Sequence, residues 1–139
     1  MVDALKEGWR VLHQGGALLD FRPLVSSPPI EIVSDESSQE VGSVDDRQAA
    51  SDSAAADRAI QTIVESGFLH QMTQSQFRVA YYWNTVGEMS EYLTSRRHPM
   101  SILPSEAEVR ELFDRTAGVN ARARLRCRWE NQLNVYTRR

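Results

Sequence analysis

Two side chains that could take part in chemistry, Asp20 and Arg22, stand two positions apart at the end of a short apolar run, residues 17–21. In open α/β sheets, ligands gather at the carboxyl ends of strands, so the pair could line a substrate pocket. The alternative is an ion pair at the strand end, or a cap for the following loop. This alternative is favoured, because charges at strand ends are common and exposed ion pairs contribute little stability.

Three consecutive aromatic residues, Tyr81, Tyr82 and Trp83, could form a wall against which a substrate packs. Such clusters more often place one side in the hydrophobic core and the other in an amphipathic surface patch. We therefore expect core packing first, and the three residues are candidates for a substrate pocket or an interface.

Four arginines, Arg122, Arg124, Arg126 and Arg128, alternate with other residues near the end of the chain. Arginines on one face of a strand repel each other unless something offsets their charge. A nucleic-acid backbone could do so, and so could acidic residues of segment 45–65, a partner subunit or solvent. The net charge is −3 and few aromatic residues interleave on that face, which disfavours nucleic acid. We expect pairing within the chain or with solvent, and Arg124 and Arg126 are candidate interface residues.

The other reactive side chains predict no catalytic residue, cofactor-binding residue or metal ligand. The three histidines lack ligand spacing. The sole cysteine, Cys127, falls on the inward side of a strand pattern and serves there as a small apolar filler. A single cysteine excludes an intramolecular disulfide and suits a reducing compartment. No segment reaches transmembrane length, so the sequence predicts a cytoplasmic protein that does not enter a membrane.

Hydrophobic periodicity in the first part of the chain predicts a helix followed by a strand. Leu5, Trp9 and Leu12 recur at helical spacing, and the pair Gly15-Gly16 would end that helix. The nearly continuous apolar run 17–21 is typical of a strand that is buried on both faces.

The middle of the chain predicts weaker elements. Residues 30–33 and 40–44 form a small solvated hairpin in this interpretation, within a flexible or solvated region, 34–53. A helical pattern then runs over residues 45–66, with Ile60, Ile63 and Val64 on one face.

The last part of the chain has the clearest patterns. Residues 77–83 alternate as a strand does, and the strand could begin as early as Phe68. Two capping boxes, which begin at Thr85 and Ser105, predict two helices. Residues 122–136 alternate between polar and apolar side chains throughout, which predicts one long strand with one buried face.

Residues 7–23, EGWRVLHQGGALLDFRP, resemble the helix, Gly-Gly and strand segment of class I S-adenosylmethionine-dependent methyltransferases of the type 11-like group. In that family, the segment leads into the fifth of seven strands. The resemblance implies that residues 1–139 form a single domain equivalent to the C-terminal half of such an enzyme. The fold it implies is α/β: a partial Rossmann-like sheet of three main strands, the last two antiparallel, with a small hairpin and packed helices. Residues 77–83 and 122–136 would be the last two strands.

The resemblance also implies what is missing. The family holds S-adenosylmethionine with a glycine-rich turn after its first strand and an acidic residue at the end of its second. Neither is present, because Gly15-Gly16 comes before a strand. The expected function is therefore a truncated or split methyltransferase that is inactive alone, and that binds S-adenosylmethionine only within the complete family fold. The alternative is a non-enzymatic α/β protein-interaction module.

The resemblance predicts a partner as well. In the family, a neighbouring strand of the N-terminal half would flank residues 17–21, so in this chain the edge of that strand is unpaired and apolar. Such edges are normally covered or paired. We therefore expect a homodimer, or a complex with a separate chain that supplies the N-terminal half.

Overall fold

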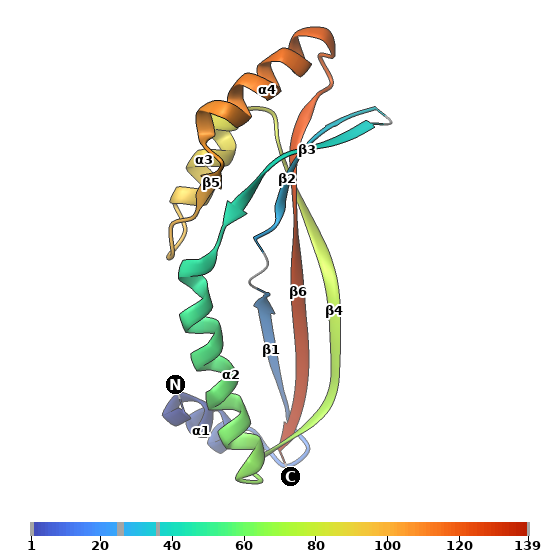
Figure 1. Cartoon of the computed structure of the whole chain (residues 1–139). Coiled ribbons are helices and arrows are strands. Elements are labelled where there is room, and N and C mark those ends of the chain that lie inside the picture. The colour runs from blue at the N-terminus through green and yellow to red at the C-terminus, as the bar shows by residue number, and fades with distance from the viewer. Residues whose placement is uncertain (1, 25–26, 36, 139) are drawn as a thin grey trace. The chain divides into compact units, whose positions relative to one another are not determined.

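The computed structural model describes residues 2–24, 27–35 and 37–138 (Figure 1). The elements, in chain order, are α1 (Val2–Val11), β1 (Ala17–Pro23), β2 (Pro29–Ser34), β3 (Ser37–Asp45), the 3-10 helix η1 (Arg47–Ala49), α2 (Ala50–Glu65), β4 (Leu69–Trp83), α3 (Val86–Thr94), β5 (Ser101–Leu103), α4 (Glu106–Val119) and β6 (Arg124–Arg138). Region 34–53, expected to be a flexible or solvated loop, thus holds β3, η1 and the first residues of α2.

The six strands form a mostly antiparallel sheet of order β1-β6-β2-β3-β5, and β4 also pairs with β6. The prediction of a partial, Rossmann-like sheet of three main strands was wrong. The hairpin was expected to be small and solvated, in addition to the three main strands, but β2 pairs with β6 and β3 pairs with β5, so both belong to the main sheet. Their apolar side chains explain the difference, since Ile30 and Val44 are completely buried and would be costly to leave in water.

The described residues divide into two compact units, each with its own core. Unit 1 comprises residues 2–24, 50–77 and 130–138, and unit 2 comprises residues 27–35, 37–49 and 78–129. The long strands β4 and β6 therefore contribute residues to both units.

The core of unit 1 is small. It consists of Ile60, Ile63, Leu69 and Tyr136, with partly buried residues from both helices packed on it. Leu5 and Trp9 of α1, and Leu12 directly after it, are among these, so the predicted inward face of that helix is confirmed. The prediction that residues 17–21 are buried on both faces was wrong, because β1 alternates between exposed and half-buried residues.

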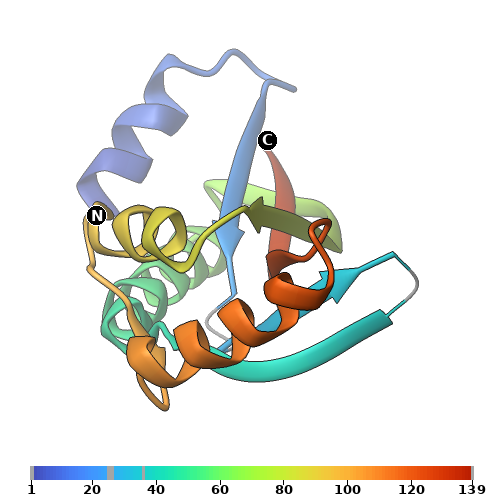
Figure 2. The same cartoon turned by 90° about the horizontal axis from the view of Figure 1, so that it is seen from above.

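The core of unit 2 is larger and lies among β2, β3, β6 and the helices α3 and α4. The two helices contact each other and β5 (Figure 1), and Figure 2 shows them from above. The N-caps of both predicted capping boxes are confirmed: the Thr85 hydroxyl accepts from the Glu88 N–H at 3.1 Å, and the Ser105 hydroxyl accepts from the Glu108 N–H at 3.2 Å. The alternation of β6 is confirmed in this unit too, where Leu125, Cys127 and Trp129 are buried.

Candidate functional site

The sheet of unit 1 has one face toward helix α2 and one open face. Paired residues of two strands share a face, and β1 pairs with β6 so that Asp20 lies opposite Asn134 and Arg22 opposite Gln132. These side chains face α2, where Arg22 reaches Asp57. The residues between them on β1 face the other way.

Asp20 and Arg22, the first predicted site residues, form an ion pair with an N–O distance of 2.8 Å. Arg22 makes a second ion pair with Asp57 of α2, also at 2.8 Å, and Asp20 accepts a hydrogen bond from the Asn134 amide at 3.1 Å. Burial lowers the pKa of Arg22, but the hydrogen bonds and charges of Asp20 and Asp57 outweigh it and leave that pKa raised. The guanidinium therefore stays charged and holds β1 to α2.

A cavity of about 250 Å³ lies between α2 and this face of the sheet. Arg22 lines it at one side, Ile60 and Val64 of α2 at another, and Gln71, Gln74 and Gln132 of the two long strands at a third. These glutamines were not among the predicted site residues. In the sequence, the alternation of the strand that ends at residue 83 slips around residues 72–75. Such a slip marks a place where side chains are redirected, and it could have pointed to Gln71 and Gln74.

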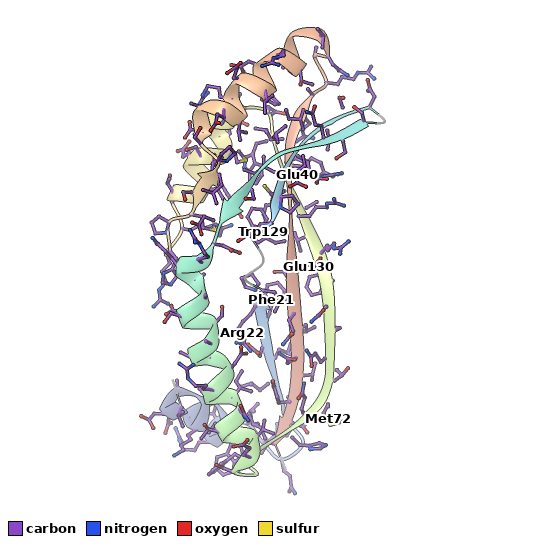
Figure 3. The ribbon with its side chains drawn as sticks, viewed as in Figure 1. Phe21, Arg22, Glu40, Met72, Trp129 and Glu130 are labelled. Atoms are coloured by element: carbon purple, nitrogen blue, oxygen red, sulfur yellow. The ribbon has the colours of Figure 1, made fainter. Side chains whose placement is uncertain are left out.

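The open face of the unit 1 sheet is apolar. Leu19, Phe21 and Met72 are 65%, 57% and 60% exposed, and Figure 3 shows Phe21 on β1 and Met72 on β4. The ring of Phe21 stacks on that of Phe77, with centroids 5.7 Å apart. We call these four residues, with Leu133 and Val135 opposite Phe21 and Leu19 on β6, the apolar face.

One edge of β1 is also open. In the described part of the chain, β1 lies at the end of the strand order and pairs with β6 alone. The N–H of Leu24 donates to the Glu130 carbonyl, and the N–H of Arg138 donates to the Gly16 carbonyl. Residues of even number therefore turn their backbone groups toward β6, because such groups alternate between the two sides of a strand. The backbone groups of Ala17, Leu19 and Phe21 point to the open edge, and Pro23, which has no N–H, ends it.

The aromatic residues Tyr81, Tyr82 and Trp83 do not form one wall. Tyr81 packs on Trp83 and, edge to face, on Trp129, at centroid distances of 6.2 Å and 5.3 Å. Tyr82 lies on the opposite face of the strand, where the guanidinium of Arg124 sits 5.1 Å from its ring centre. Trp83 therefore belongs to the core of unit 2, while Tyr81 packs on that core and stays 37% exposed. Tyr82 makes a cation–π contact at the surface.

The arginines of β6, and Arg122 just before it, have partners inside the chain. Arg126 and Arg128 both bind Glu31 of β2, at 2.9 Å each, and Arg122 reaches Asp35 at 3.4 Å. The sequence suggested acidic partners in segment 45–65, and Glu31 was missed. Its signal was a lone carboxylate within the apolar strand 30–33. Because of these partners, and of the ring of Tyr82 near Arg124, the four arginines need no nucleic acid to offset their charge.

The cysteine thiol, which was expected to be unreactive, is buried. Burial raises the pKa of the Cys127 thiol to about 12, with a smaller contribution from the charge of Glu31, so the thiol stays protonated and unreactive near neutral pH. Among residues 2–24, 27–35 and 37–138, the side chains form no group of three or more that could hold a metal ion.

Comparison of the chain with protein-family models, with curated proteins and with solved structures finds no match. Within the described residues, no helix combines the length and apolar character needed to cross a membrane.

Proposed function

We propose that this chain is a non-enzymatic protein-interaction module, and that unit 1 associates with a second copy of the chain by strand addition at β1. One observation carries the proposal: β1 has an open backbone edge, and its exposed side chains at that edge, Leu19 and Phe21, are large and apolar.

The physical argument concerns the edge first. An unpaired strand edge is a template for another strand, and proteins that remain single usually protect it with charges, proline or a covering element. On β1 the two charged side chains, Asp20 and Arg22, are turned toward α2 and bound there. Only Pro23 limits the edge, at one end. Added strands gain main-chain hydrogen bonds, and the side chains beside them give selectivity.

The exposed side chains add the second part of the argument. Complete burial of a leucine or phenylalanine side chain is worth about 1.5–3 kcal/mol. A two-fold pairing of β1 with β1 would bring Leu19 and Phe21 of both copies to one interface, because a two-fold axis uses the same patch twice. In the homodimer, the backbone groups at the open edges of both β1 strands would be hydrogen-bonded, and four apolar side chains would be shielded at the same interface.

A second candidate follows from the family resemblance: the chain is part of a split S-adenosylmethionine-dependent methyltransferase, inactive until another polypeptide supplies the cofactor-binding half. The observation that favours it is the place of β6, which pairs with both β1 and β4. In the family resembled, the final strand also lies between the fifth and sixth, although the order β1-β6-β2-β3-β5 of the whole sheet is not that of the family. A partner strand on the open edge of β1 would then come from the other polypeptide.

Light scattering and sedimentation over a wide range of protein concentration test the first candidate. We expect a reversible dimer, and we expect Leu19→Lys to weaken it about tenfold or more, because a lysine at an edge opposes pairing. Val119→Lys is the matched control, since Val119 is exposed on α4 and far from β1 in sequence. Amide hydrogen exchange at Leu19 and Phe21 should slow as the dimer forms.

A chain that stays monomeric at every concentration, with those amides exchanging freely, would rule out the homodimer. Calorimetric titration with S-adenosylmethionine then tests the second candidate. Heat that appears only when a polypeptide with the cofactor-binding half is added supports the split enzyme, and no heat in either case excludes it for that pair.

A further inference from the structure

Part of the unit 1 sheet departs from the ordinary arrangement of polar and apolar side chains. A sheet face under a helix normally carries apolar residues, and the face toward water carries polar ones. Here the apolar face is open, and the side turned to α2 holds Asp20, Arg22, Gln132 and the buried Asn134 next to the core residues Leu18 and Tyr136. Burying polar groups costs free energy unless they are hydrogen-bonded. Such an arrangement is typical of a binding site, where a few convergent polar groups orient a ligand.

Arg22, Gln132 and Asn134 line the cavity of about 250 Å³ described above, together with Gln71 and Gln74 of β4. The Gln74 amide donates to the carbonyl of Gln132 at 2.9 Å, and the Gln71 amide donates to Asn134 at 3.4 Å. A carboxamide has two N–H donors and an oxygen acceptor. These contacts use one N–H of each donor, so they leave the side-chain oxygens of Gln71 and Gln74 and the NH₂ group of Gln132 available to a ligand.

The electrostatics of the cavity exclude one class of ligand. Asp20 and Asp57 carry two negative charges against the single positive charge of Arg22, and both carboxylates occupy its guanidinium. A phosphate or carboxylate would therefore find a net negative wall and no free cation among these three groups. A neutral ligand avoids that repulsion.

The apolar side of the cavity further limits the class of ligand that it could bind. Ile60 is buried on α2 and Val64 lies one helical turn later, so together they give the cavity an apolar wall. A planar ring packs on such a wall, and its edge can meet adjacent donor and acceptor groups of carboxamides. Glutamine and asparagine read the edge of a nucleobase in this bidentate way, and enzymes that hold a single base pack it on apolar side chains.

We propose that the cavity between α2 and the unit 1 sheet binds a neutral planar heterocycle with an amide-type edge, the chemistry of a free nucleobase. Its volume lies just below the range of about 300–1,000 Å³ typical of sites for larger ligands, which suits a molecule of one or two rings. The site lies on the face of the sheet opposite the apolar face, so it does not depend on the proposed association through β1.

Two-dimensional NMR of the full-length chain, titrated separately with adenine, uracil and glucose, tests this inference. We expect the side-chain NH₂ signals of Gln71, Gln74 and Gln132 to shift with a nucleobase. Gln132→Leu, which keeps the approximate size and removes the carboxamide, should weaken binding about tenfold or more. Gln39→Leu, on exposed β3 of unit 2, is the matched control and should leave binding unchanged.

Titration with adenosine monophosphate tests the effect of a negative charge on the ligand, and this nucleotide should bind more weakly than adenine. If Gln132→Leu perturbs the fold, the binding of a nucleobase to Gln74→Leu and the shifts of the three glutamines in the wild-type chain test the site instead. Shifts spread evenly over the chain, or none at these glutamines, overturn the site. Shifts there with glucose but with neither base, or tighter binding of the monophosphate, overturn the ligand class.

Discussion

Glu31 lies directly opposite Arg126 in the β2–β6 pair, and its carboxylate accepts two hydrogen bonds from the guanidinium, from Nε at 2.9 Å and Nη2 at 3.1 Å. Arg128 donates to the same carboxylate at 2.9 Å. The side chain of Glu31 is only 10% exposed. One nearly buried acid therefore offsets two arginines that would otherwise repel each other along β6.

Replacement of Glu31 by alanine should lower the free energy of unfolding by about 2 kcal/mol, because charge-assisted hydrogen bonds of this kind contribute about 1.5–3 kcal/mol. Urea denaturation followed by circular dichroism measures the change. Glu111→Ala is the control: its pair with Arg115 on α4 is exposed on both sides, so it should change stability by no more than about 0.5 kcal/mol. Equal effects of the two variants would contradict a special role for Glu31.

The same carboxylate should make stability depend on acid pH. The hydrogen bond from Arg126 is the main cause that holds the pKa of Glu31 below its ordinary value of 4.5. Since the folded form then binds fewer protons than the unfolded form, the stabilisation is complete above pH 4.5 and is lost as the pH falls through the lowered pKa. Unfolding free energies from about pH 6 down to about pH 3 should fall less steeply for Glu31→Gln than for wild type. Parallel curves would show that the carboxylate is not bound in solution.

Local patterns were a reliable guide to the elements. The strict alternation of residues 122–136 predicted β6, because each second side chain of that strand does face a core. The capping boxes at Thr85 and Ser105 predicted α3 and α4, because a cap depends on residues within one helical turn.

The order of the strands could not be read in the same way. A helix, Gly-Gly and strand segment specifies how α1 enters β1, but it carries no information on which strand lies next to β1. That choice depends on residues far apart in the chain, such as Glu31 and Arg126, or Leu19 and Val135. A resemblance over one local segment therefore could not predict the strand order of the sheet, in which β2 and β3 are full members.

Candidate site residues were predictable where the interaction is short in sequence. Asp20 and Arg22 are two positions apart on one strand, so they share a face and can meet. Gln71 and Gln132 are brought to one cavity only by the pairing of β4 with β6. The slip in alternation around residues 72–75 marks an irregular place in β4, but no local pattern shows that this place meets Gln132.

Gly42 on β3 should tolerate no side chain. A Cβ atom there would collide with the carbonyl oxygen of Leu103 on β5 and would lie 3.1 Å from Val109. Gly42→Ala should therefore cost about 1–3 kcal/mol, the range for overpacked positions. Gly118→Ala is the opposite case, since a methyl group there meets open space, and in helix α4 it should stabilise by about 0.5–1 kcal/mol. Thermal unfolding measures both effects, and the midpoint should fall for Gly42→Ala and rise for Gly118→Ala. If both midpoints move in the same direction, the packing of β3 on β5 differs from that described.

Arg138 should hold helix α1 in place. Its guanidinium donates to the carbonyl oxygens of Trp9, Arg10 and Leu12 and lies 4.2 Å from the centre of the Trp9 ring. A cation is favourable at the carbonyl end of a helix, and stacking on tryptophan adds to it. Arg138→Ala should therefore cost about 1–2 kcal/mol and speed amide exchange across residues 2–11, while exchange in α4 stays as it was. Arg138→Lys should fall between the two, because lysine keeps the charge but loses the fork of donors. Unchanged exchange in α1 of the alanine variant would show that the helix is held by its apolar face alone.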